Sequence, residues 1–167
     1  MMKSINNYIK KVALIGSFRK PENYKLIKDI IKLIEAQKIF VVSPMGSDVN
    51  AKRDDFVIFE TDNKNFSNEK IQFDTITKIF ASNAVYVINI NGYIGKTTSY
   101  EIGRIIEKKI PLYFIEYPKD LPICVSKEQI VKPNEFIRIM QYSKENFIDF
   151  SCDSCDNFQQ CISKGDL

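Results

Sequence analysis

The chain has 167 residues, of which 44% are hydrophobic and 27% charged, a composition typical of a globular protein that can bury one core. The 24 basic and 21 acidic residues leave a formal charge of +3, and the lysines are scattered, which does not favour a nucleic-acid partner. There is no histidine, so Ser-His and Cys-His catalysis and histidine-ligated metals are excluded.

The first apolar run is Val12-Ala13-Leu14-Ile15, closed by Gly16. It is too short for a signal sequence, and no later segment is long enough to span a bilayer. We therefore expect a cytoplasmic protein without a membrane partner. A short continuous apolar run that ends at a glycine predicts a buried parallel strand.

Helical and strand patterns then alternate along the chain. Apolar residues at spacings of three and four predict helices over residues 22–37, from Ile71 to near Asn83, and over residues 98–108. Apolar runs predict strands at residues 39–42, 84–88 and 112–115. Residues 47–68 show no periodicity and predict a long loop with a short element near residues 56–59. Two short helices are expected at residues 127–130 and 135–141.

This alternation predicts a compact three-layer α/β/α fold with a parallel, flavodoxin- or Rossmann-like sheet. Such sheets bind ligands beyond the carboxyl ends of their strands. We expect residues 1–118 to form the α/β domain and residues 119–167 to form a C-terminal extension with short helices and a cysteine-rich tail.

The stretch Ile90-Asn91-Gly92-Tyr93-Ile94-Gly95-Lys96-Thr97-Thr98-Ser99-Tyr100-Glu101-Ile102-Gly103 contains the most informative motif. Its Gly-Lys-Thr is preceded by a glycine at Gly92, too close for the nest of amides in an ATPase phosphate loop. Thr98 and Glu101 have the spacing of a helix capping box. Alternatively, Glu101 is a functional carboxylate kept ionised by the positive end of the helix dipole.

Residues 82–117, SNAVYVININGYIGKTTSYEIGRIIEKKIPLYFIEY, resemble a segment of the nucleoside 2-deoxyribosyltransferase-like superfamily. This superfamily includes deoxyribosyltransferases and deoxynucleoside 5'-monophosphate N-glycosidases, on a compact parallel-sheet fold. The resemblance covers about residues 10–117 and is specific in Gly-Tyr-Ile-Gly, from Gly92 to Gly95, and in Thr98-x-x-Glu101.

The resemblance implies that Glu101 is the nucleophile that takes the sugar. It implies that Gly92 and Gly95 let the loop backbone approach the substrate, with Tyr93 and Thr98 beside it. The loop Gly16-Ser17-Phe18-Arg19 is similar to the Gly-Ser-x-Arg of the monophosphate glycosidases. There the amides, the Ser17 hydroxyl and the Arg19 guanidinium would meet a 5'-phosphate; the other interpretation is a solvated turn. Phe18, Tyr93 and Met45 could give the base or sugar an apolar wall, or they could be core or plain surface.

A second superfamily carboxylate orients the sugar or protonates the leaving base. Asp74 is the nearest match to it, although Thr75 could hold the position instead, and a carboxyl of the long loop is a further candidate. The chain also has Asn83 where the superfamily commonly has Asp, and Gly95 where the transferases carry Asp. The second departure favours a hydrolase over a transferase.

The sequence thus suggests cleavage or transfer of an N-glycosidic bond in a nucleoside or nucleoside 5'-monophosphate, without a cofactor for the chemistry. The alternative is a nucleotide-binding or sensing module on the same fold, without turnover. The resemblance further implies a homodimer or a larger assembly, because superfamily members complete their pockets across subunits.

Three of the four cysteines, Cys152, Cys155 and Cys161, are crowded near the end of the chain. Their spacing is close to that of a zinc or iron–sulfur site, with Cys124 or an external ligand as the fourth donor. The other interpretation is a tail that packs on the domain with free thiols.

Overall fold

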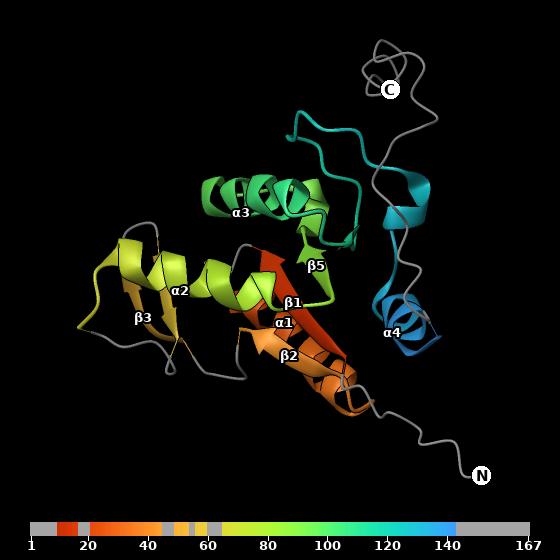
Figure 1. Ribbon diagram of the computed structural model, residues 1–167, viewed down its shortest axis with the longest axis horizontal. Helices are drawn as coiled ribbons and strands as arrows, with labels where there is room; N and C mark the ends of the chain where they lie inside the picture. The colour runs from red at the N-terminus through yellow and green to blue at the C-terminus, as the bar shows by residue number, and fades with distance from the viewer. Residues whose placement is uncertain (1–9, 17–20, 45–48, 54–55, 60–64, 143–167) are drawn as a thin grey trace.

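The computed structural model describes residues 10–16, 21–44, 49–53, 56–59 and 65–142, and it describes their side chains except in 21–22, 49–53 and 56–59. The elements of the first half are β1 (Lys11–Gly16), α1 (Pro21–Glu35), β2 (Phe40–Ser43), β3 (Val49–Arg53), β4 (Phe56–Phe59) and α2 (Asn68–Phe80). Those of the second half are β5 (Ala84–Ile88), η1 (Ile90–Gly92), α3 (Lys96–Glu107), β6 (Leu112–Phe114), η2 (Lys127–Gln129) and α4 (Pro133–Tyr142), shown in Figure 1.

The core of the fold is a four-stranded parallel sheet with the order β2-β1-β5-β6. The chain leaves β1 for β2 on one side and later returns to pair β5 on the other side of β1. The strand order therefore reverses between β1 and β5, whose carboxyl ends meet where Gly16 pairs with Ile88. In open α/β sheets, this reversal point is where ligands bind.

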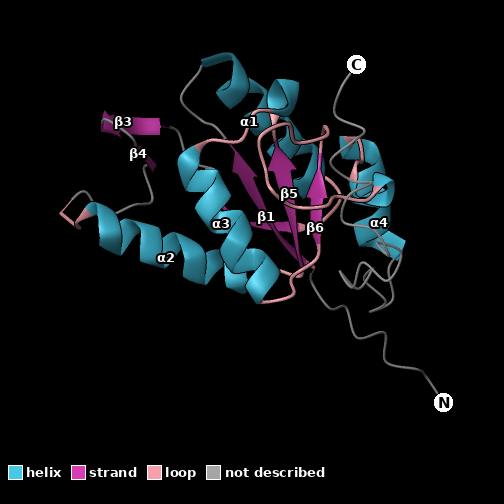
Figure 2. Ribbon diagram, turned by 90° about the horizontal axis from the view of Figure 1, so that it is seen from above, coloured by secondary structure: helices cyan, strands magenta, loops and turns pink. Residues whose placement is uncertain are grey.

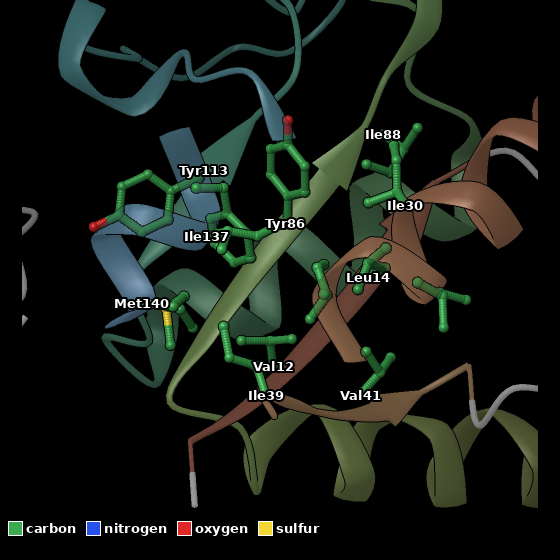
Figure 3. Close-up of a cluster of buried hydrophobic side chains, with 14 of the residues drawn as sticks. Val12, Leu14, Ile30, Ile39, Val41, Tyr86, Ile88, Tyr113, Ile137 and Met140 are labelled. Carbon is green, nitrogen blue, oxygen red and sulfur yellow. The ribbon is translucent and has the colours of Figure 1, made fainter. Parts of the chain in front are cut away.

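One face of the sheet is covered by α1 and α4. Alternate residues of the strands, such as Val12, Leu14 and Tyr86, pack there against both helices, as Figure 3 shows. The Tyr86 ring stacks on Phe136 of α4 with centroids 4.5 Å apart, and Tyr113 meets the same Phe136 ring edge-on at 5.6 Å. These three rings fix α4 against β5 and β6.

The other face is covered by α2 and α3. The intervening strand residues, including Ala13, Val85 and Val87, pack there against Ile79 of α2 and Ile105 of α3. Figure 2 shows α2 and α3 on one side of the strands and α4 on the other. The structure therefore confirms the expected three-layer α/β/α fold with a parallel sheet.

The described part of the expected C-terminal extension is built into this core. Phe136 and Met140 are fully buried, and Ile130 forms a parallel β-bridge with Phe114 at the end of β6. The Tyr86 hydroxyl donates a hydrogen bond to the Val131 carbonyl at 2.7 Å. Residues 119–142 thus belong to the same packing unit as the strands that precede them.

Three elements differ from the sequence expectation. The segment expected to be a long loop with a short element near residues 56–59 contains that element as β4, but it also contains β3, which pairs with β4 in an antiparallel hairpin outside the main sheet. Helix α2 ends at Phe80, three residues before Asn83, whose side-chain oxygen accepts a hydrogen bond from the Lys11 amide at 2.7 Å. Helix α3 begins at Lys96, two residues before the expected start.

The helices are short relative to a bilayer. None in the described part of the chain is long and apolar enough to cross a membrane.

Candidate functional site

The loop between β5 and α3 is tied to the loop that follows β6. Asn89, which is completely buried, donates from its side-chain amide to the Glu116 carbonyl at 2.7 Å. Its side-chain oxygen accepts from the Glu116 amide at 3.3 Å. One carboxamide therefore satisfies both backbone groups of the same residue across the sheet edge, which joins the carboxyl ends of β5 and β6.

Two further hydrogen bonds continue this junction. The Gly92 carbonyl accepts from the Lys119 amide at 3.0 Å, and the Ile94 amide donates to the Asp120 carboxylate at 3.1 Å. The loop that carries the Gly-Tyr-Ile-Gly motif is thus held along its length by residues 116–120. A loop fixed in this way presents α3 in one position.

The structure explains two of the predicted site glycines by backbone contacts. Gly92 has a φ of +74°, and a Cβ there would lie 2.6 Å from the Tyr117 carbonyl oxygen. A Cβ on Gly16 would lie 2.6 Å from the Ile88 carbonyl oxygen. Both positions need glycine so that two backbone segments can approach at the sheet edge.

Gly95 differs from these two because its φ of −74° suits any residue, and a Cβ there would meet only the Tyr93 ring at 3.9 Å. It is the residue before the first turn of α3, without a side-chain cap. The Tyr93 side chain is 58% exposed beside it. Gly95 and Tyr93 therefore form open surface at the start of the helix.

The capping-box interpretation of Thr98 and Glu101 is wrong. Because α3 begins at Lys96, Thr98 lies inside its first turn and is buried, and Glu101 lies in the second turn. Glu101 is therefore too far along the helix to bond the amides that precede it. The Glu101 side chain is directed at another helix.

Glu101 meets Gln72 of α2. The Gln72 side-chain amide donates to Oε1 of Glu101 at 3.3 Å, and Glu101 is only 7% exposed. Both residues lie one turn into their helices, and α3 begins just beyond the carboxyl end of β5. The pair thus places a buried carboxyl close to the edge where ligands of this fold bind.

Burial raises the pKa of Glu101 from 4.5 to about 7, and the hydrogen bond from Gln72 opposes part of this rise. The expectation that the helix dipole keeps Glu101 ionised is therefore wrong. The dipole acts mainly within the first turn, whereas Glu101 lies beyond it in a desolvated position. A carboxyl with a pKa near neutrality can both give and take a proton at physiological pH.

Asp74, the predicted second carboxyl, is engaged elsewhere. It forms an ion pair with Lys70 at 2.7 Å on the surface of α2, and its side chain is 36% exposed. Since successive helical residues are about 100° apart, Asp74 points about 160° away from Gln72. Thr75 is about 60° from Gln72, so it shares that face of α2. The structure does not bring Asp74 to Glu101.

Several predicted site residues lie outside the described residues. They are Ser17, Phe18 and Arg19 of the suggested phosphate loop and Cys152, Cys155 and Cys161 of the suggested metal site. Within the described part of the chain, no group of three or more His, Cys, Asp or Glu side chains could hold a metal ion. Cys124 is exposed.

Gln72, Asn89 and Asp120 are site residues that the sequence did not reveal. Each acts through a long-range contact, to Glu101, Glu116 and Ile94 respectively. Only Asn89 carried a signal, as a polar residue directly after the most apolar strand. A buried amide at that position indicates that the loop has backbone groups to satisfy.

Comparisons with known proteins add little to this geometry. The chain matches no protein-family model and no curated protein. A conserved protein from Enterococcus faecalis V583, known from its crystal structure, aligns with 64% of this chain at 15% identity and a TM-score of 0.45. The alignment spans 63% of that protein.

Proposed function

We propose that the protein cleaves or transfers the N-glycosidic bond of a nucleoside or nucleoside 5'-monophosphate, with Glu101 as the nucleophile. The observation that carries this proposal is the Glu101 carboxyl itself. It is buried between α2 and α3, bonded to a neutral amide, and has a pKa near neutrality. Buried carboxyls with perturbed pKa values at a ligand-binding edge are candidates for acid–base or nucleophilic chemistry.

The reaction has two steps. An oxygen of ionised Glu101 bonds to C1' of the sugar while the C1'–N bond breaks, and the electron pair leaves on the base, which takes up a proton. Water, or a second base in a transfer, then attacks C1', the bond between C1' and Glu101 breaks to release the carboxylate, and the proton of the attacking group passes to the acid that had protonated the leaving base. The proton for the leaving base requires an acid, and because Asp74 is paired with Lys70 away from Glu101, the remaining candidates are the carboxyls of residues 47–68.

Two features of the described residues support this reaction. The helix that carries Glu101 follows a loop held at Asn89, Gly92 and Ile94, so the carboxyl has a fixed position. The exposed Tyr93 ring at the start of α3 is an apolar surface of the kind that contacts a base or a sugar. The resemblance of residues 82–117 to the deoxyribosyltransferase-like superfamily points to the same bond.

The test is a panel of nucleosides and nucleoside monophosphates, with release of free base followed by chromatography. We expect release by the wild type, loss in Glu101→Gln, and retention in the matched control Glu107→Gln, whose side chain is 67% exposed on the same helix. Since the nucleophile must be ionised, kcat/KM should fall as the pH drops below about 7. Equal activity of Glu101→Gln and the wild type would overturn the proposal.

A second candidate is a nucleotide-binding or sensing module without turnover. The ion pair between Asp74 and Lys70 favours it, because the predicted acid is not directed at Glu101. Calorimetric titration with the same panel separates the two functions. Tight binding without any release of base supports the sensor and excludes the enzyme for those ligands.

The suggested assembly and tail site remain proposals from the sequence. Sedimentation of the full chain would test the homodimer or larger assembly. Metal analysis of protein purified without oxygen or chelator would test zinc or an iron–sulfur cluster at the three tail cysteines.

A further inference from the structure

We propose that Gln72 is the positioning residue of the candidate site: it holds Oε1 of Glu101 and leaves Oε2 as the attacking oxygen. This inference rests on the proposed function for its chemical meaning. The contact between the two side chains is a feature of the fold whether or not turnover occurs.

The two oxygens of Glu101 have different surroundings. Gln72 donates to Oε1 at 3.3 Å, and no other side chain or amide in the described part of the chain donates to either oxygen. A carboxyl held at one oxygen has its plane fixed, because rotation about its last bond would break the hydrogen bond. The unheld oxygen then points in a defined direction, which is what in-line attack at C1' requires.

The chemical nature of Gln72 suits a carboxyl that changes its charge. Its NH₂ group donates to a carboxylate, and after rotation its carbonyl accepts from a carboxylic acid. An arginine or lysine at this place would instead hold the pKa of Glu101 well below neutrality. The causes that set this pKa are burial and the Gln72 hydrogen bond, with no charged side chain of the described residues among them.

The same bond assists the second chemical step. When Glu101 is esterified through Oε2, its Oε1 becomes the carbonyl oxygen of the ester and carries little charge. As water attacks C1', the carboxylate leaves and negative charge returns to Oε1. A donor already placed there stabilises this charge as it develops.

The experiment compares the wild type with Gln72→Leu. Its matched control is Gln141→Leu, because Gln141 also donates from its amide, to Gln37 at 2.9 Å, but lies on α4 at the opposite face of the sheet. Carboxyl carbons are labelled with ¹³C, and the Glu101 signal is assigned by its disappearance in Glu101→Gln. The titration midpoint of that signal is then measured without any substrate.

We expect the Glu101 midpoint to move to higher pH in Gln72→Leu and to stay at the wild-type value in Gln141→Leu. At pH 6 the ionised fraction of Glu101 should fall by about three- to tenfold, which is the effect of losing one ordinary side-chain hydrogen bond. Gln72→Glu should raise the midpoint as well, because a second carboxyl disfavours charge on the first. An unchanged midpoint in Gln72→Leu would overturn the inference.

The base-release assay provides the second measurement. If the wild type is active, the loss of kcat/KM in Gln72→Leu should be larger at pH 6 than at pH 8, which a merely structural defect would not produce. An equal loss at both pH values would count against positioning. If the wild type releases no base, the proposed function fails, and the titration still decides whether Gln72 holds Glu101.

Discussion

Replacement of Glu101 by glutamine should stabilise the protein, and increasingly so as the pH rises. A folded-state pKa of about 7 against an ordinary 4.5 means that the folded protein binds the Glu101 proton more tightly than the unfolded chain does. The stability gained from this proton is fully present below pH 4.5 and is lost as the pH rises to about 7. The full interval corresponds to about 3 kcal/mol.

Glutamine has nearly the same shape, accepts the hydrogen bond from Gln72 and never ionises. The quantity of interest is the free energy of unfolding of Glu101→Gln minus that of the wild type. Compared with its value at pH 4, this difference should be larger by about 1 kcal/mol at pH 5 and by about 3 kcal/mol at pH 8. Urea titrations at these pH values measure it. In a chain of 167 residues the larger difference raises Tm by about 6–12 °C.

Glu107→Gln is the control, because Glu107 lies on the same helix with its side chain 67% exposed. Its difference from the wild type should not grow across this pH range. A stability difference for Glu101→Gln that is the same at pH 5 and pH 8 would refute the argument that burial of this carboxyl opposes folding. A gain in stability from removal of a charged group is typical of functional sites.

Two further predictions concern the loop before α3. Gly92→Ala should lower the free energy of unfolding by at least about 2 kcal/mol, because Gly92 has a positive φ and a Cβ there would meet the Tyr117 carbonyl. Gly95→Ala should change this free energy little. Gly103→Ala should raise it by about 0.5–1 kcal/mol, because a Cβ at this helical position would have no atom within 4 Å; urea titrations measure all three. Equal effects at Gly92 and Gly95 would contradict the described backbone contact. Asn89→Ala should cost about 2–4 kcal/mol and speed hydrogen exchange at the Glu116 amide, since both Glu116 backbone groups lose their partner; unchanged exchange there would show that Asn89 does not join the loops.

The sheet could be predicted because its strands are short apolar runs such as Ala84–Ile88, whose buried character is visible in the sequence. In the hairpin, the apolar strand Phe56–Phe59 matches the expected short element, whereas Val49–Arg53 could not be predicted, because its sequence, VNAKR, is mostly polar. Its pairing depends on backbone hydrogen bonds that leave no periodic pattern. The start of α3 was misplaced by two residues because Thr98 has the residue type of a cap, while the structure uses Gly95.

Glu101 could be singled out from its motif, but its environment could not. The electrostatic state of a carboxyl depends on whether it is desolvated, and that depends on the approach of α2 to α3. Gln72 is one polar residue in a helix, and nothing in its spacing distinguishes it from a solvated side chain such as Asp74. Gln72 and Glu101 are 29 positions apart in the sequence, and they meet because their two helices pack on the same face of one sheet.

The aromatic stack that joins β5 to α4 limits how short the chain can be made. Phe136 stacks on the Tyr86 ring and meets the Tyr113 ring edge-on. A version ending at residue 118 would uncover both tyrosine rings and leave the Tyr86 hydroxyl without its acceptor at Val131. Such a fragment would self-associate through the sheet face that α4 normally covers. The shortest version that keeps this face covered therefore extends at least to Tyr142.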